Sequence, residues 1–313
     1  MAIFLDEQQV GELLDMESCI AALDEAFRDK AVGEAAIQPR RRLPFQGRRF
    51  HLMAASMLRQ GYLGFKAYGA ARGQDVVLYK AGEGTVAFMR SGRLGQIRTG
   101  AASGLATKYM ARVDASRLGC FGTGNQAETQ LQAIASVRKL ESIHVYGRDR
   151  ERRTSFAAKM TALLEQEVRP VETPAEAVRG RDIVVTITSA SDPVFDGKLL
   201  DPGTHVNAAG GNVRTSREVD EVVVTRAGTI AADDLEAAKL ESGDLDWAVQ
   251  AGLIAWDRVY ELAHIVAGFV PGRRSDDEIT LFESQGIALE DVAAGSLVYE
   301  RARERGIGTP LPF

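Results

Sequence analysis

The stretch Gly-Thr-Gly-Asn-Gln-Ala at residues 122–127 has the composition and spacing of a turn that binds phosphate groups. A short apolar run at 117–121 precedes it, and a segment of helical periodicity follows it. In such a strand–turn–helix, the first glycine permits the sharp turn and the second lets a pyrophosphate approach the backbone. The N–H groups and the dipole at the start of the helix then attract the phosphates. The sequence therefore predicts a dinucleotide site here; the alternative is a tight turn without a ligand.

The residues after the second apolar run, 142–146, indicate which dinucleotide binds. An aspartate or glutamate at this strand end accepts hydrogen bonds from the ribose 2′-hydroxyl and selects NAD. Here Gly147, Arg148 and Asp149 follow the run, so the strand-end carboxylate is missing and Arg148 is in reach of a 2′-phosphate. The sequence thus favours NADP(H), with NAD(H) as the other possibility. In the alternative interpretation, Asp149 turns back to the ribose, or the arginines form a solvated run.

Three cations lie in or beside apolar segments of the first part of the chain, namely Arg41, Lys66 and Arg98, which opens a helix rich in small residues. A buried lysine has a lowered pKa and can act as an acid or a base. Guanidinium groups match the geometry of a carboxylate. Together these residues could clamp and protonate an acidic substrate. The alternative is three unrelated cations whose charged ends reach water.

Among the four histidines, His51 is the candidate proton donor, because it lies in the same predicted sheet as the buried lysine. His205 begins the strand that leads to Asn212, and we expect it near a bound nicotinamide. Structural roles are expected for His144 and His264. No H-E-x-x-H, C-x-x-C or G-x-S-x-G motif occurs in the sequence, so neither a metal site nor a serine-nucleophile elbow is predicted.

The elements that must position these residues follow two different patterns of predicted secondary structure. Between 41 and 89, apolar runs broken by glycine-containing turns predict a mostly antiparallel sheet. Beyond residue 114, strands alternate with helices, one of them at 216–227, which is typical of a doubly wound parallel Rossmann sheet. We therefore expect an α/β protein whose domains are residues 1–114, joined by a C-terminal helix at about 291–313, and residues 115–290.

The composition agrees with an ordinary globular protein. Of the 313 residues, 45% are hydrophobic and 26% are charged, and the net charge is −5, which argues against a nucleic-acid partner. No apolar run is long enough to cross a membrane, and the two cysteines cannot form a disulfide framework. We expect a cytoplasmic protein that binds small molecules.

Seven segments spread over nearly the whole chain resemble the ornithine cyclodeaminase/μ-crystallin family. They are QPRRRL (38–43), GFKAYG (64–69), IRTGAASGLATKYMAR (97–112), GCFGTGNQAETQ (119–130), DIVVTITSASDPVF (182–195), PGTHVNAAGGN (202–212) and ITLFESQGIALEDVAAG (279–295). The resemblance implies a homodimer in which an open-barrel-like N-terminal domain serves substrate binding and dimerisation. A Rossmann domain would bind the cofactor.

The resemblance also implies roles for individual residues. Arg41, Lys66 and Arg98 fall on the positions that bind the substrate carboxylate and take part in catalysis. Arg148 and Asp149 fall at a strand end that is more similar to NADP-using members than to NAD-using cyclodeaminases. The positions that contact the cofactor correspond to Thr99, Gly122, Thr123, Gly124, Asn125, Gln126, Thr188, Ser189 and Ser284.

Two features depart from the cyclodeaminase pattern. Cyclodeaminases carry an aspartate, thought to activate the substrate amine, where this chain has Asn212, and an amide cannot take up a proton at neutral pH. The segment between Lys66 and Asp75 is also shorter than the Asn-rich loop of cyclodeaminases, which implies a different substrate pocket.

The residues and the resemblance together predict NAD(P)H-dependent reduction of a small 2-imino acid to an L-amino acid, or the reverse oxidative deamination. Arg41 and Arg98 would hold the α-carboxylate, and Lys66, or a water it positions, would relay the proton, with His51 as the alternative. The substrate could be alanine-like, aspartate-like or cyclic, and Arg72 would suit a second carboxylate. The other hypotheses are an ornithine or lysine cyclodeaminase and a non-catalytic NADPH-dependent binding protein of μ-crystallin type.

Overall fold

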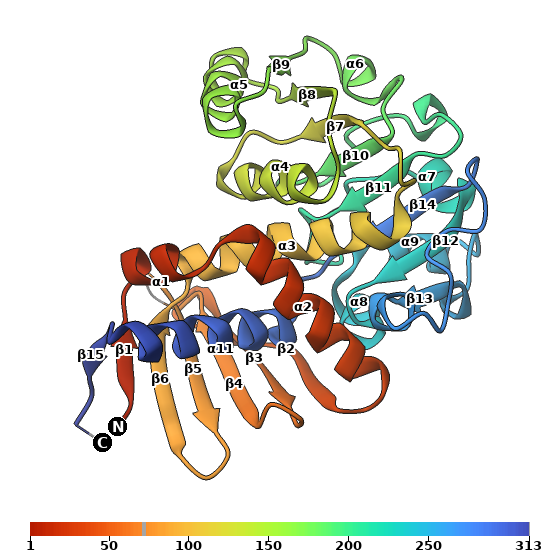
Figure 1. Ribbon diagram of the computed structural model, residues 1–313. Coiled ribbons are helices and arrows are strands. Elements are labelled where there is room, and N and C mark those ends of the chain that lie inside the picture. Colours follow the sequence, from red (N-terminus) through yellow and green to blue (C-terminus); the bar gives the residue numbers. More distant parts are fainter. Residues whose placement is uncertain (71–72, 313) are drawn as a thin grey trace. The chain divides into compact units, whose positions relative to one another are not determined.

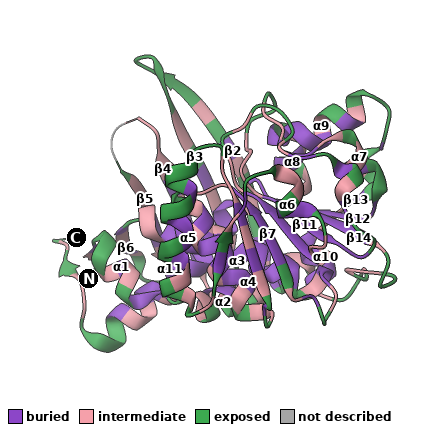
Figure 2. Cartoon of the chain, turned by 90° about the horizontal axis from the view of Figure 1, so that it is seen from above, coloured by how far each residue is buried: buried purple, intermediate pink, exposed green. Residues whose placement is uncertain are grey.

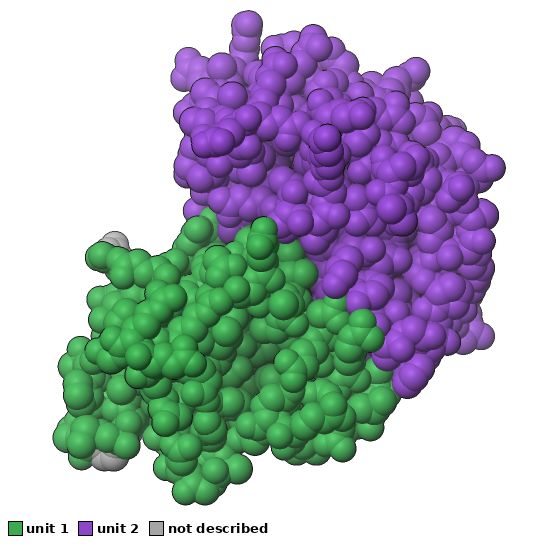
Figure 3. Space-filling model, viewed as in Figure 1, with its two compact units in different colours: residues 1–101, 286–313 green, residues 102–285 purple. Residues whose placement is uncertain are grey.

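The computed structural model describes residues 1–70 and 73–312 (Figure 1). Arg72, a candidate for binding a second carboxylate, lies outside these residues. Buried residues are concentrated in the strands at the centre of the larger of two sheets (Figure 2). The chain divides into two compact units, residues 1–101 with 286–313, and residues 102–285 (Figure 3). The division falls inside helix α3 (Gly92–Met110), which begins before Arg98 rather than at it.

The first unit contains a seven-stranded sheet in the order β15-β1-β6-β5-β4-β3-β2. Among the described residues of this sheet, only β1 and β6 pair in parallel, so the prediction of a mostly antiparallel sheet is confirmed. Its strands are β1 (Ile3–Leu5), β2 (Ala35–Phe45), β3 (Arg48–Met57), β4 (Tyr62–Tyr68), β5 (Gln74–Lys80), β6 (Gly84–Arg90) and β15 (Thr309–Pro310).

One face of this sheet is covered by helix α11 (Ala288–Arg305), which crosses the strands and also packs against α2 (Met16–Ala31) (Figure 1). A short helix, α1 (Glu7–Leu13), lies against β6 and α11. Because side chains alternate along a strand, Gly64 and Lys66 of β4 face α11. A Cβ on Gly64 would lie 3.0 Å from a methyl group of Val292, so the glycine allows the helix to approach the sheet closely.

The second unit contains an eight-stranded parallel sheet in the order β13-β12-β14-β11-β10-β7-β8-β9. The predicted doubly wound sheet is confirmed. The order reverses between β7 and β10, which makes the carboxyl ends of these two strands the expected place for a ligand. The strands are β7 (Arg117–Phe121), β8 (Ser142–Tyr146), β9 (Val168–Pro170), β10 (Ile183–Thr186), β11 (His205–Ala208), β12 (Ala227–Ala232), β13 (Val259–Glu261) and β14 (Ile279–Glu283).

Apolar side chains of this sheet and of the helices around it form two buried clusters. The helix predicted at 216–227 is shorter than expected, because the Asp220 side chain accepts a hydrogen bond from the Val223 N–H and starts α7 there. The helices are α4 (Asn125–Val137), α5 (Arg150–Leu164), α6 (Pro174–Val178), α7 (Glu221–Arg226), α8 (Leu235–Glu241), α9 (Gly243–Gln250) and α10 (Leu262–Val266).

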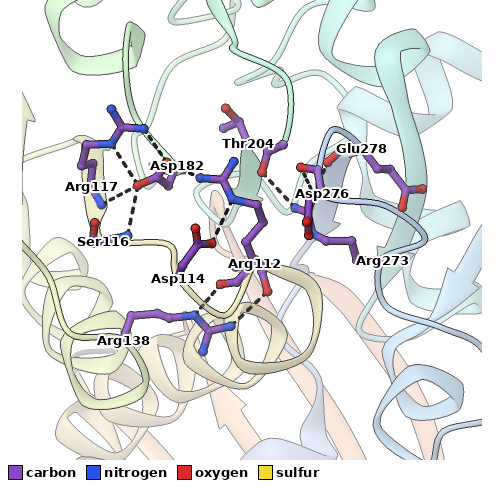
Figure 4. Close-up of polar contacts among 12 residues, drawn as sticks. Arg112, Asp114, Ser116, Arg117, Arg138, Asp182, Thr204, Arg273, Asp276 and Glu278 are labelled. Atoms are coloured by element: carbon purple, nitrogen blue, oxygen red, sulfur yellow. Dashed lines mark hydrogen bonds and ion pairs between the residues drawn. The ribbon is translucent and has the colours of Figure 1, made fainter.

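A buried carboxylate, that of Asp182, fixes the amino edge of the parallel sheet (Figure 4). It accepts hydrogen bonds from the backbone N–H groups of Ser116 and Arg117, both at 3.0 Å. The guanidinium groups of Arg112 and Arg117 donate to it at 2.7 and 2.8 Å. Burial alone would raise the pKa of Asp182, but these donors, foremost Arg117, lower it to about 2.

None of the helices in residues 1–70 and 73–312 is both long and apolar enough to span a membrane.

Candidate active site

The turn after β7 has no room for a larger residue at its first glycine. Gly122 has a φ of +122°, and a Cβ on it would lie 2.3 Å from the carbonyl oxygen of Ile187, just beyond β10. The small third residue, Ala127, is fully buried where α4 packs on the sheet. Both requirements are those of a dinucleotide turn.

The start of α4 is open. Gly124 is its N-cap residue and has no side chain to occupy the first N–H groups, and the space around its Cβ position is empty within 4 Å. Helices of this length attract anions at such an end through their N–H groups and dipole. The segment from Gly122 to Gln126 therefore fits the pyrophosphate of a dinucleotide.

The end of β8 lies beside this turn, since a Cβ on Gly147 would lie 3.0 Å from the Thr123 side chain. Asp149 is the N-cap of α5, and its carboxylate accepts a hydrogen bond from the Arg152 N–H at 3.0 Å. Arg148 is exposed. The carboxylate in this segment is thus engaged by its own helix, while the guanidinium group faces solvent.

The segments after β10 and β11 lie at the same carboxyl edge of the parallel sheet as the turn after β7. Thr188 follows β10, and Ser189 beside it is exposed. Gly210 follows β11 and lies so close to the backbone of Thr188 that a Cβ on it would be 2.4 Å from the Thr188 carbonyl oxygen. Ser284 follows β14, farther along the sheet, and its hydroxyl lies 3.5 Å from Asp233. The candidate cofactor residues of this unit therefore share the carboxyl edge of the sheet, and all but Ser284 lie near the reversal of strand order between β7 and β10.

The first unit holds a buried cluster of charges. Lys66 is 3% exposed, and its Nζ lies 3.0 Å from Oδ1 of Asp291. Nε of Arg98 lies 3.1 Å from the same oxygen, and its Nη1 lies 2.5 Å from Oε2 of Glu290. Two predicted site residues, Lys66 and Arg98, are thus brought together. The two carboxylates that hold them, in the first turn of α11, were missed by the sequence analysis.

The third predicted cation is placed differently. Arg41 is exposed, whereas its neighbour Arg40 is buried and donates to the carbonyl oxygen of Gly286 at 2.7 Å. The pairing of β2 with β3 shifts register between Gln38 and Arg41. Pro39 lies in this irregularity and cannot donate a ladder hydrogen bond, which explains the bulge. The bulge turns Arg40, instead of Arg41, toward the cluster.

Burial and neighbouring charges set the chemistry of the cluster. Burial lowers the pKa of Lys66, Asp291 opposes this shift, and the positive charge of Arg98 adds to it. Burial also acts to lower the pKa of Arg98, but Asp291 and Glu290 outweigh it and raise the value. A Cβ on Gly95 of α3 would lie 2.7 Å from Nζ of Lys66, so this glycine makes room for the ammonium group. Lys66 is therefore a buried amine that can exchange a proton.

His51 lies on β3, stacked on the ring of Tyr68 with the centroids 4.5 Å apart. Burial, followed by the charges of Arg42 and Arg40, lowers the pKa of His51, which favours the neutral imidazole. The Nζ of Lys66 lies 5.7 Å from the centroid of the same tyrosine ring. The structure thus places His51 near Lys66 through one shared ring.

Three further candidates are placed as follows. Thr99 lies on α3, where its hydroxyl donates to the Gly95 carbonyl oxygen at 2.7 Å. Asn212 is partly buried in the segment that follows β11. His205 is fully buried at the amino end of β11, where its ring contacts Thr280, so its expected place at the cofactor edge is wrong. Burial lowers the pKa of His205 to about 3, so the ring is neutral.

A search of the described residues for groups of three or more histidine, cysteine, aspartate and glutamate side chains that could hold a metal ion finds none.

Comparison with known proteins gives consistent results. The model of the ornithine cyclodeaminase/mu-crystallin family matches residues 2–306. A Δ1-pyrroline-2-carboxylate reductase from Bacillus cereus is 38% identical over 236 residues, 75% of this chain and 72% of that protein. An alanine dehydrogenase from Archaeoglobus fulgidus is 32% identical over 324 aligned positions, covering 99% of this chain and 98% of that protein.

A solved structure agrees in fold as well. Δ1-Pyrroline-2-carboxylate reductase of Thermococcus litoralis, in complex with NADH and L-proline, matches with a TM-score of 0.93 and 32% identity. The match covers 99% of this chain and 100% of that one. The family resemblance and the fold class predicted from the sequence are both confirmed. The chain belongs to the ornithine cyclodeaminase/mu-crystallin family.

Proposed function

We propose that this protein reduces a small 2-imino acid to the corresponding L-amino acid with a nicotinamide dinucleotide, and catalyses the reverse deamination. The observation that carries the proposal is the buried Lys66–Arg98–Asp291–Glu290 cluster in a chain that also has a dinucleotide turn. Its relatives named above are reductases and dehydrogenases of imino and amino acids. The protein is thus an oxidoreductase acting on carbon–nitrogen bonds.

The charges of the cluster suit an acidic substrate. Two buried cations, Lys66 and Arg98, meet at one carboxylate oxygen of Asp291. Cations that gather in this way would attract the α-carboxylate of an imino acid. Guanidinium groups bind carboxylates with two parallel hydrogen bonds and so fix the orientation of the substrate.

The roles follow from this arrangement. The reduced nicotinamide, when bound, supplies a hydride for the imine carbon. Arg98, with Arg40 or Arg41, would hold the carboxylate and aim that carbon. Lys66, or a water it positions, would keep the imine nitrogen protonated, with His51 as the alternative donor. Binding of the cofactor is assigned to the parallel-sheet unit and binding of the substrate to the antiparallel-sheet unit.

The test is oxidation of NADPH and NADH by the purified protein. Pyruvate, oxaloacetate and glyoxylate with excess ammonia or methylamine, and cyclic imino acids alone, cover the candidate substrates. Oxidation with one of them would identify the substrate class. If none reacts, release of ammonia and proline from ornithine with catalytic NAD would point to a cyclodeaminase. Tight binding of an aromatic carboxylate without any turnover would point to a binding protein of μ-crystallin type.

The preference for NADP(H) depends on Arg148. Replacing it with alanine is expected to raise the Kd of NADPH by roughly tenfold or more, because a charge-assisted hydrogen bond to the 2′-phosphate is lost. The Kd of NADH should stay unchanged. Arg150→Ala, two residues on at an 81% exposed side chain, is the matched control. Equal binding of both nucleotides by the wild type would remove Arg148 from cofactor selection.

The open face of the antiparallel sheet supports a homodimer. Leu52 and Leu63, which are 37% and 50% exposed, point away from the face that α11 covers. Phe65 and Tyr79 lie on the same open face, with their ring centroids 6.4 Å apart. An apolar face of this kind on a folded chain is typical of a protein–protein interface.

Replacing Leu63 with aspartate is therefore expected to convert the dimer to a monomer, since a carboxylate would be buried without a partner. Light scattering coupled to size-exclusion chromatography measures the mass directly. The control is Leu58→Asp, at a leucine that is 59% exposed in the turn after β3. A dimer in both variants would place the interface elsewhere.

A further inference from the structure

The carboxylate of Glu218 is buried at the carboxyl edge of the parallel sheet, with 1% of the residue exposed. Its Oε1 accepts hydrogen bonds from the backbone N–H and the hydroxyl of Thr188, both at 2.6 Å. Its Oε2 accepts from the Gly210 N–H at 2.6 Å and from the Thr186 hydroxyl at 2.9 Å. Four donors on two oxygens fill the accepting capacity of an ionised carboxylate.

These donors belong to two different segments. Thr186 is the last residue of β10, and Thr188 lies just beyond it. Gly210 lies in the segment after β11. A Cβ on Gly210 would lie 2.5 Å from Oε1 of Glu218, so the glycine is needed for the carboxylate to fit. The Thr188 hydroxyl also accepts from the Ala190 N–H at 3.1 Å, which continues the bonding into the next residues. One side chain thus connects the carboxyl ends of β10 and β11, next to the reversal of strand order.

The backbone that carries Glu218 is itself fixed. The N–H groups of Glu218 and Val219 donate to Oδ1 of Asp244, in the first turn of α9, at 2.9 and 3.0 Å. Burial, and then the neighbouring charge of Glu218, raises the pKa of Asp244. Burial also raises the pKa of Glu283, whose Oε1 accepts from Ser242 at 2.9 Å. The Glu218 carboxylate therefore cannot move away without breaking bonds in its own support.

We infer that Glu218 is a positioning residue for the dinucleotide: it holds the segments 187–190 and 209–211 in the shape that the cofactor requires. The inference rests on the proposed function, because it assumes that the cofactor binds at this edge. Glu218 acts through Thr188 and the backbone of Gly210 rather than through contact with the ligand. Thr188 was selected from the sequence as a cofactor residue, whereas nothing in the sequence marked Glu218.

The experiment replaces Glu218 with glutamine and titrates the full-length protein with NADH, followed by the fluorescence of the nucleotide. Glutamine keeps the shape but turns an NH2 group toward two donors, so one backbone N–H loses its acceptor. The Kd of NADH is expected to rise about tenfold, with the KM of the imino acid changed far less.

The matched control is Asp182→Asn. Asp182 is an equally buried carboxylate with several donors, but it lies at the amino edge of the same sheet (Figure 4). The Asp182→Asn variant should have a lower denaturation temperature than the wild type and the same Kd for NADH. If Glu218→Gln and Asp182→Asn lower stability alike and neither changes the Kd, Glu218 is structural only and the inference is wrong.

A milder variant covers the case in which Glu218→Gln does not fold. Thr186→Val removes one donor to Oε2 at a fully buried site and keeps the volume of the side chain. It should raise the Kd of NADH about threefold; an unchanged Kd in a folded Thr186→Val protein would contradict the inference. Wild-type protein that binds neither NADH nor NADPH would instead overturn the proposed function.

Discussion

Replacing Lys66 with methionine is expected to lower the turnover number by roughly 10²- to 10⁴-fold, the usual contribution of a positioned acid or base. The dinucleotide turn at residues 122–127 belongs to the other unit, so the Kd of NADH should be unchanged. The fold should persist, since Asp291 keeps its contact with Arg98 at 3.1 Å. Steady-state turnover with the preferred imino acid, beside a NADH titration, separates the two effects.

The control is Lys80→Met in the same unit, where the lysine pairs with Glu300 at 2.6 Å and is 23% exposed. The pH profile gives a second check. Burial lowers the pKa of Lys66, and imine reduction requires its protonated form, so wild-type activity should fall as the pH rises through that lowered value. Near-normal turnover in Lys66→Met would remove Lys66 from the mechanism and bring His51 forward.

Replacing Arg98 with methionine is expected to reduce the free energy of unfolding by about 3–5 kcal/mol, because the buried carboxylates of Glu290 and Asp291 each lose a salt bridge. Glu290 and Asp291 are 0% and 1% exposed, so water cannot replace the guanidinium group. Urea denaturation measures the change. The control is Arg28→Met, at an exposed ion pair with Asp24, where surface pairs contribute less than about 1 kcal/mol.

A double variant tests the cause of this loss. Converting Glu290 to glutamine in the Arg98→Met background removes the carboxylate that has lost its salt bridge to Arg98, while Asp291 keeps Lys66 at 3.0 Å, so part of the stability should return. If Arg98→Met is no more destabilising than Arg28→Met, the cluster is solvated in solution and the charge argument for the substrate site fails.

The sequence predicts the general fold because each of its two patterns can be recognised within short segments. Alternating strands and helices after residue 114 produce the parallel sheet, and glycine-broken apolar runs produce the antiparallel one. Short elements outside these two patterns were missed, including β1 with three residues and α1 with seven. Long segments with one repeating pattern are easier to identify than short ones at an edge.

The candidate site could be predicted where the spacing of residues is characteristic, as at 122–127, or where a residue type is unusual in its surroundings. A lysine in an apolar run, such as Lys66, draws attention because a buried amine is rare. Glu290 and Asp291 look like ordinary acids of a first helical turn, and only the packing of α11 shows that they are buried. Choosing between Arg40 and Arg41 required the bulge, which depends on strand pairing. Glu218 acts on backbone N–H groups, which leave no trace in the sequence.

The contacts of the buried cations also bear on the order in which the molecule folds. Arg40, Lys66 and Arg98 take their partners from Gly286, Glu290 and Asp291, at the far end of the chain. The second unit, by contrast, is one continuous segment, 102–285. During synthesis the second unit can complete its sheet before residues 286–291 have been made. The buried cations of the first unit lack these partners until then, and buried ions need partners. The unit that contains residues 1–101 can therefore be completed only after residues 102–285 have been synthesised.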